Sequence, residues 1–223
     1  MNERILLLTH EAYENTLLAD ALRLHNVHVI GGAHDLSTAE NMVRNLNPDV
    51  MVVDIHHDHR DFLAFAQEQR SLRPHLGLVY LLSCPDLRLY GIQERDIPYG
   101  SQLVLRESVT DINVLKEAIS RAREKADTGR EFEWFGSHSN SPHHAMVSVL
   151  RELTDAQIET LLLIVSGKSN SQIGRIRFVT EKSVEQMVSR IAQHLGVAAE
   201  RYENLRVLIT REYFHLISSP KYR

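Results

Sequence analysis

Histidine and carboxylate side chains are concentrated in one short stretch of the sequence. Between Asp54 and Asp61 the chain reads Asp-Ile-His-His-Asp-His-Arg-Asp, and imidazole and carboxylate groups are ligands for zinc and iron. A metallohydrolase is therefore one alternative, although adjacent residues of a regular element rarely aim at one ion. The chain has no glycine-rich phosphate loop, no nucleophile elbow and no pair of cysteine ligands. We therefore expect no catalytic residue and no bound metal, and a solvated loop that contains His56, His57, Asp58 and His59.

Polar side chains that are able to reach base edges or phosphates repeat at helical spacing near the carboxyl end of the chain. Apolar residues, among them Val184 and Ile191, lie on the opposite side of the same helix and should pack inward. A helix that is supported from behind and presents a polar outer face has the geometry of helix-turn-helix DNA recognition. The alternative is an ordinary three-helix bundle with a solvated outer face. The polar face consists of Lys182, Gln186, Ser189, Arg190 and Gln193.

The elements that would hold this face are three short helices between residues 153 and 197. Thr154 and Gln157 have the spacing of a capping box at the start of the first helix. Ser169 begins a second helix with the same box, and Thr180 caps the third. The apolar stripe of the first helix is predicted to be Ile158, Leu161, Leu162 and Val165.

This segment resembles the LuxR/GerE-type helix-turn-helix of the NarL/FixJ group of bacterial regulators. The resemblance implies that the third helix binds DNA, with Ser183 among its contacts, and that a fourth helix, about residues 199 to 217, completes the module and carries a dimer contact. Closing the domain core is the other role open to that helix. Candidates for contact with the DNA backbone are Lys168, Ser169, Asn170 and Arg201. The match is carried by Leu153-Thr154, the run from Leu161 to Gly167, Ser169-Asn170, Ile173, Thr180, Ser183-Val184, Ile191 and Leu195-Gly196-Val197, with Arg201 beyond.

Three residues of the third helix depart from the family pattern. Glu185 stands where the family has a lysine near the DNA backbone, and Met187 and Arg190 replace a histidine and an asparagine. A carboxylate at position 185 repels phosphate. A protein-interaction module with weakened DNA binding is therefore a second hypothesis for the chain.

Short apolar runs alternate with helical patterns in the amino-terminal half. Strands are predicted at residues 5–8, 27–30, 49–54, 78–82 and 103–105, with helices between them and a last helix at about 111 to 125. This alternation predicts a parallel sheet that is covered by helices on both faces. The expected fold is thus a doubly wound five-stranded α/β domain, followed by a small all-α domain.

Residues 1 to 125 resemble the receiver domain of response regulators, with the flavodoxin-like fold. Asp54, at the carboxyl end of the third strand, takes the place of the phospho-accepting aspartate. Ser83 fits the family's hydroxyl after the fourth strand, and Arg106 occupies the position of the lysine that contacts the phosphoryl group. Where a receiver has an acid pair for magnesium, this chain has Thr9-His10, with Glu11 one residue later.

Two interpretations of Asp54 follow. It is either phosphorylated by a partner histidine kinase or a structural carboxylate in a domain that responds to something else or serves in dimerisation. Magnesium prefers oxygen ligands, so Thr9 and His10 replace the acid pair poorly, and we favour the second interpretation. No cofactor is expected, apart from Mg²⁺ if Asp54 is phosphorylated.

Composition is consistent with two modest domains in 223 residues. The single cysteine, Cys84, excludes an intramolecular disulfide framework and fits a reducing cytoplasm. Neither a signal peptide nor a membrane-spanning stretch is predicted. From Arg151 onward there are 11 Lys and Arg against 8 Asp and Glu, whereas the preceding part has 14 against 21. This slightly basic carboxyl end is compatible with DNA binding.

The sequence as a whole predicts a cytoplasmic bacterial transcription regulator and not an enzyme. An atypical receiver-like domain at residues 1–125 is joined by an exposed linker, residues 126–148, to a helix-turn-helix domain at residues 149–218. The expected partners are double-stranded DNA and a second copy of the chain, with no membrane. As a dimer, the protein would place the third helix of each copy in successive major grooves.

Overall fold

The chain divides into two compact units that interrupt one another in sequence. A computed structural model describes residues 3–55, 61–128, 131–135, 150, 152–198 and 203–217. The first unit contains residues 1–83 and 93–138, and the second contains Cys84–Ile92 together with Ser139–Arg223. A short piece of chain within the predicted receiver-like region, residues 84–92, therefore belongs to the second unit.

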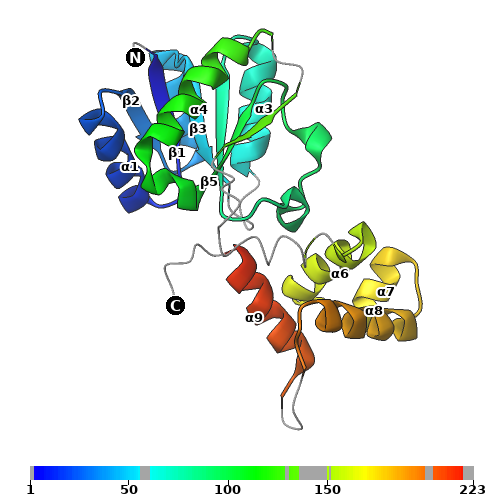
Figure 1. The fold of residues 1–223 in the computed structure, drawn as a ribbon. Coiled ribbons are helices and arrows are strands. Elements are labelled where there is room, and N and C mark those ends of the chain that lie inside the picture. The colour runs from blue at the N-terminus through cyan, green and yellow to red at the C-terminus, as the bar shows by residue number, and fades with distance from the viewer. Residues whose placement is uncertain are drawn as a thin grey trace. The chain divides into compact units, whose positions relative to one another are not determined.

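A parallel sheet forms the centre of the first unit (Figure 1). The strand order is β2-β1-β3-β4-β5-β6, and every pairing is parallel. Strands β1, β3, β4 and β5 are almost entirely buried, as expected for strands that are covered on both faces. The strands are β1 (Arg4–Leu8), β2 (His28–Ala33), β3 (Val50–Asp54), β4 (Gly77–Leu82), β5 (Gln102–Leu105) and β6 (Glu133–Phe135).

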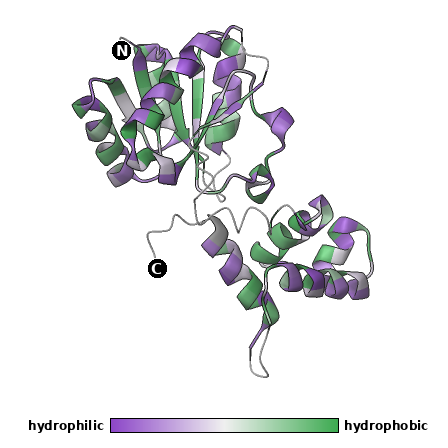
Figure 2. Ribbon diagram, viewed as in Figure 1, coloured by the Kyte–Doolittle hydropathy of each residue, from purple (hydrophilic) through white to green (hydrophobic). Residues whose placement is uncertain are grey.

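Four helices cover the two faces of this sheet. Helices α1 (Ala12–Leu24) and α4 (Ile112–Lys125) contact one another on one face, and α2 (Leu36–Leu46) and α3 (Asp61–Leu72) on the other. Alternate strand residues such as Val52 and Leu81 pack against apolar residues of α1 and α4. Figure 2 shows that the strands in the middle of the sheet consist largely of hydrophobic residues. Among the described residues, 3-10 turns follow β4 and β5. Turns η2 (Glu94–Asp96) and η3 (Arg106–Thr110) belong to the first unit, and η1 (Leu87–Tyr90) belongs to the second.

The doubly wound parallel fold is confirmed, but the predicted number of five strands is wrong. The sixth strand, Glu133–Phe135, lies inside the stretch that was predicted to be linker and pairs with β5. Three contacts join it to α4. The Glu133 carboxylate pairs with Lys125 Nζ and lies 3.6 Å from the Arg121 guanidinium, which is also 5.4 Å from the centre of the Phe135 ring. The added strand covers the edge that β5 would otherwise expose.

The larger part of what the structure describes of the second unit consists of helices α6 (Asp155–Val165), α7 (Asn170–Arg177), α8 (Glu181–His194) and α9 (Leu205–Ile217). Their shared core contains Leu161, Ile173, Ile191 and Ile209, each fully buried. The predicted stripe of the first helix is partly wrong, because Ile164 is buried in the core whereas Leu162 and Val165 are only half-buried. Among the described residues, we find no helix with both the length and the apolar character that a membrane-spanning segment needs.

Candidate DNA-binding face and the Asp54 site

Backbone capping sets the start of each helix in the helix-turn-helix. The capping boxes predicted at Thr154 and Ser169 are confirmed. Each hydroxyl accepts a hydrogen bond from the backbone N–H three residues later, and the side-chain oxygen of the glutamine at that position accepts one from the backbone N–H of the capping residue. Thr180 Oγ1 accepts from the Ser183 N–H at 3.2 Å and so caps α8. These bonds satisfy N–H groups that have no partner within the helix.

The turn between α7 and α8 depends on two backbone positions. A Cβ atom at Gly174 would lie 2.8 Å from the Val179 carbonyl oxygen, so the close approach of the turn to α7 excludes a side chain there. Phe178 ends α7 at φ 56° and ψ 41°, in the left-handed region, and its side chain is 95% exposed. A hollow of about 790 Å³ lies beside this turn and is lined by residues of both helices.

The predicted two faces of α8 are present in the structure. Val184, Val188 and Ile191 are buried, whereas Leu195, predicted to pack inward with them, is only half-buried. The outward side is polar and carries both cations and the acid Glu185. The residues of this outer face are all exposed: Lys182, Ser183, Glu185, Gln186, Ser189, Arg190 and Gln193.

The start of α7 is held by an arginine that the sequence analysis did not identify. Arg206, in the first turn of α9, donates to Asn170 Oδ1 at 2.7 Å and also to the Lys168 carbonyl oxygen. Partial burial lowers the pKa of Arg206. The side chains of Lys168 and Ser169 are exposed beside it, whereas that of Asn170 is half-buried, and Arg201 lies outside the described residues.

A second unpredicted arginine connects α7 with α6. Arg177 is 17% exposed in its side chain and donates to the Ala156 carbonyl and to the Thr160 hydroxyl, itself 1% exposed. Its guanidinium also lies 3.4 Å from the Glu159 carboxylate. The largely buried charge of Arg177 therefore has hydrogen-bond acceptors and a carboxylate close by, as buried charges require.

The structure places Asp54 and Arg106 together at the carboxyl edge of the sheet. The Asp54 side chain is 3% exposed and forms an ion pair with the guanidinium of Arg106, which is 18% exposed. Arg106 also lies 3.7 Å from the Glu14 carboxylate. An internal cation thus faces the carboxylate at the position where a receiver binds its phosphoryl group.

The other residues predicted near Asp54 differ in their surroundings. Thr9 is 2% exposed and donates its hydroxyl to the Glu11 carbonyl oxygen, while His10 stacks on the Phe62 ring at 4.3 Å between centres. Glu11 is exposed and precedes α1, and Ser83 is half-buried. The cluster from His56 to His59 lies outside the described residues. In the part of the chain that the structure describes, no group of three or more His, Cys, Asp or Glu residues is arranged to hold a metal ion.

Comparison with known proteins gives a family for the carboxyl-terminal region. Residues 151–202 match the family described as bacterial regulatory proteins, luxR family. The chain is 29% identical over 199 residues to the transcriptional regulatory protein LiaR of Bacillus subtilis, covering 87% of this chain and 92% of LiaR. It is 25% identical over 173 residues to the response regulator protein VraR of Staphylococcus saprophyticus, covering 77% of this chain and 79% of VraR.

Solved structures share the fold over nearly the whole chain. RcsB from Salmonella enterica serovar Typhimurium, bound to promoter rprA in the presence of phosphomimetic BeF3−, has a TM-score of 0.53 at 14% identity and covers 96% of this chain and 98% of its own. A structure of two RcsB dimers bound to two parallel DNAs also has a TM-score of 0.53, at 15% identity, covering 98% of this chain and 100% of that one. At this level of identity, the likeness concerns the fold.

Proposed function

We propose that the chain is a LuxR-family regulator of the response-regulator type, with an atypical receiver-like unit and a helix-turn-helix, and that it reads DNA sequence through the outer face of α8. It is a DNA-binding transcription regulator, and we place its action in the cytoplasm, with no enzymatic role. The observation that carries the proposal is the exposed polar face of α8, backed by a buried apolar stripe. Side chains on such a face are able to reach base edges in a major groove.

The candidate residues divide by the contacts that their chemistry allows. Glutamine and arginine form paired hydrogen bonds with base edges, so we assign Gln186, Arg190 and Gln193 to sequence recognition. Lys168 and the exposed start of α7 suit phosphate, because a helix N-terminus and a lysine both attract anions. Glu185 lies on the same exposed face, where its repulsion of phosphate disfavours DNA that approaches in the wrong register.

The RcsB dimers bound to DNA and the response-regulator relatives support two further parts of the proposal. The chain acts on DNA as a homodimer, so that two copies of α8 meet successive major grooves of a partly palindromic site. Val207 and Phe214 are exposed on α9, at 64% and 38%, and are our candidates for the dimer contact. If Asp54 is phosphorylated, the donor is a histidine kinase.

Asp54 is proposed to be a structural carboxylate and not the phosphoryl acceptor. Its ion pair with Arg106 supplies internally the positive charge that a receiver obtains from magnesium and lysine. Arginine keeps the charge of lysine but not its compact ammonium group. The receiver-like unit would then respond to another input than phosphorylation, or serve in dimerisation.

Arg190→Ala tests the recognition face. Duplexes selected by the full-length wild type from a random library serve as the probe, with binding measured by gel shift at two salt concentrations. We expect a loss of roughly tenfold or more in affinity for a selected duplex, with little loss for an unselected one. Lys168→Ala should instead weaken both duplexes alike and reduce the salt dependence.

Arg23→Ala is the control, since Arg23 is an exposed arginine on α1 whose side chain pairs with Asp20. It removes the same charge outside the proposed face and outside α9, which carries the candidates for the dimer contact. Equal affinity of wild type and Arg190→Ala for the selected duplex would refute the assignment of α8. Failure of the wild type to enrich any duplex would instead favour the protein-interaction module.

A further inference from the structure

One segment of the chain folds with the DNA-binding unit although it lies between two strands of the other unit. Residues 84–92 follow β4 and precede β5 in sequence, yet they cluster with residues 139–223. The segment contains η1 and is apolar on its inner side, where Leu87, Leu89 and Tyr90 are all buried. Helix α6 of the unit contacts η1 directly.

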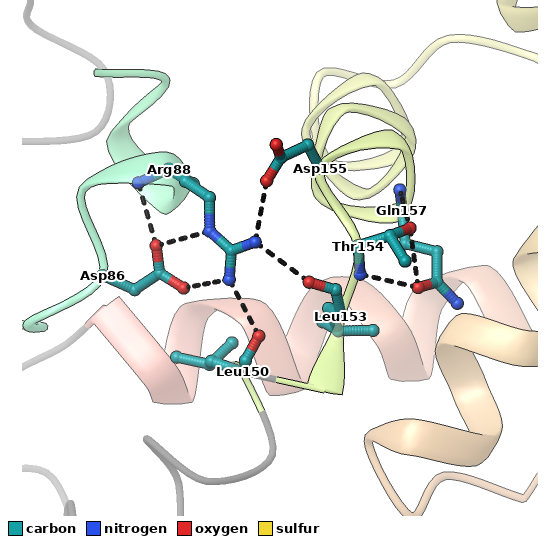
Figure 3. Close-up of polar contacts among 7 residues, drawn as sticks. All are labelled: Asp86, Arg88, Leu150, Leu153, Thr154, Asp155 and Gln157. Atoms are coloured by element: carbon teal, nitrogen blue, oxygen red, sulfur yellow. Dashed lines mark hydrogen bonds and ion pairs between the residues drawn. The ribbon is translucent and has the colours of Figure 1, made fainter. Parts of the chain in front are cut away.

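Arg88 connects this segment to the start of α6 (Figure 3). Its Nη1 donates to the Leu153 carbonyl oxygen and to Asp155 Oδ1, both at 2.9 Å, and its Nη2 donates to the Leu150 carbonyl oxygen at 2.9 Å. Asp86 accepts from Nε at 3.0 Å and from Nη2 at 2.8 Å. All five N–H donors of the guanidinium thus have an acceptor, which a lysine with three donors is unable to reproduce.

The Asp86 carboxylate prepares Arg88 for this role. It also accepts the backbone N–H of Arg88 at 3.0 Å, so that it caps η1 and orients the guanidinium at once. Hydrogen bonds to the Asp86 and Asp155 carboxylates raise the pKa of Arg88 and keep it charged. The side chain is 32% exposed, so most of it is removed from water.

A second attachment comes from α9. The Tyr213 hydroxyl donates to the Leu89 carbonyl oxygen at 2.9 Å, and the Tyr213 residue is 1% exposed. On the segment itself, the Tyr90 hydroxyl accepts the backbone N–H of Cys84 at 2.8 Å, which closes the loop on itself. Two helices of the DNA-binding unit therefore hold η1 through different residues.

We infer that residues 86–90 are a docking element, anchored by Arg88, through which the chain that leaves the carboxyl end of β4 is attached to α6 and α9 of the DNA-binding unit. The outer face of α8 remains exposed while the element is docked, so docking does not act by covering that face. It attaches the unit at a point of the chain far in sequence from the boundary between His138 and Ser139, where the chain passes from the first unit into the second. Ser83, at the carboxyl end of β4, is separated from the element by only Cys84 and Pro85.

The test is amide hydrogen exchange of the full-length chain, read by mass spectrometry on peptides that carry η1, α6 and α9. Arg88→Ala should raise exchange in η1 and α6 by roughly tenfold, and Tyr213→Phe should raise exchange in η1 and α9. Arg88→Lys should give a smaller increase in exchange, because lysine keeps the positive charge and loses only the paired N–H donors of the guanidinium. Peptides from β1 and β3 should not change. Arg211→Ala is the control, as it removes an arginine from α9 whose side chain pairs with Glu212 and not with η1.

Alkylation of Cys84 gives a second measurement of how often residues 84–92 open. It is the only cysteine of the chain and is 1% exposed, so its alkylation by iodoacetamide under native conditions reports opening of the segment. Faster alkylation and faster exchange in both Arg88→Ala and Tyr213→Phe would support the inference. Exchange in η1 and α6 that is unchanged in both variants, or raised equally by Arg211→Ala, would overturn it. If Arg88→Ala unfolds the protein and raises exchange throughout the chain, Arg88→Lys and Tyr213→Phe replace it in the test. A rise in η1 exchange in these two variants, with β1 and β3 unchanged, supports the inference, and no rise overturns it.

Discussion

Arg106→Met should destabilise the first unit strongly, and removing the Asp54 charge as well should restore part of the loss. Methionine approximates the length and volume of arginine, so the main change is the loss of the cation that faces Asp54. The Asp54 side chain is 3% exposed, and an ion pair so well buried costs about 3–5 kcal/mol when only one partner is removed. Asp54→Asn alone should cost less, about 1–2 kcal/mol, because Arg106 retains Glu14 at 3.7 Å.

The double variant Asp54→Asn with Arg106→Met contains neither charge. Its free energy of unfolding should therefore exceed that of Arg106→Met by about 1–3 kcal/mol, although it carries one more substitution. Trp134, the only tryptophan, lies on β6, so its fluorescence during urea denaturation follows the first unit separately from the second. Arg23→Met is a suitable control, since the Arg23 pair with Asp20 is exposed and should change stability by less than about 0.5 kcal/mol. If the double variant were as unstable as Arg106→Met, the Asp54 charge would not depend on Arg106, and the proposed internal neutralisation would be wrong.

Four shorter predictions test the remaining features. Acetyl phosphate with Mg²⁺ should leave the intact mass of the protein unchanged, whereas a mass increase that Asp54→Ala abolishes would show phosphorylation there. Phe178→Gly should raise the free energy of unfolding of the second unit by about 1 kcal/mol in a thermal denaturation, because glycine relieves the left-handed strain while the lost side chain is 95% exposed. Burial raises the pKa of the Cys84 thiol to about 12, so it should stay protonated and react slowly with Ellman's reagent at pH 8 until urea unfolds the chain. Because the unfolded thiol ionises first, the Cys84 contribution to stability should be present below about pH 9 and be lost between about pH 9 and 12, which urea titrations at several pH values measure.

Local signals in the sequence predicted most of the second unit. The capping boxes at Thr154 and Ser169 depend on residues three positions apart, and the faces of α8 depend on helical spacing, so both are visible in a single sequence. The position of Asp54 at a strand end was predictable for the same reason. The positions along the chain of β1 to β5 were predicted from short apolar runs, because such runs indicate strands that are buried on both faces.

The features that the sequence analysis missed all depend on contacts between residues far apart in the chain. Strand β6 is only three residues long, and its pairing with β5 is set by the free edge of a sheet that must form first. Arg206 joins Asn170 across 36 positions, and Arg88 reaches Asp155 across 67. An arginine that is exposed and one that connects two elements look alike in a sequence. Several of the acceptors are backbone carbonyl oxygens, which every residue has, and the side-chain acceptors lie far away in the chain.

The Asp54–Arg106 ion pair and the docking element together suggest where the proposed regulator receives its signal. If Arg106 neutralises the Asp54 carboxylate within the fold, Asp54 is already paired and is not the phosphoryl acceptor. The input signal would then act at another site of the protein. A ligand or partner shifts a conformational equilibrium only where it contacts the two states differently. The attachment of η1 offers such a place, since undocking would expose Leu89 and Tyr213, both buried in the docked state, and would free the Asp155 carboxylate from Arg88. A partner that binds those surfaces would favour the undocked state and leave the chemistry of α8 unchanged.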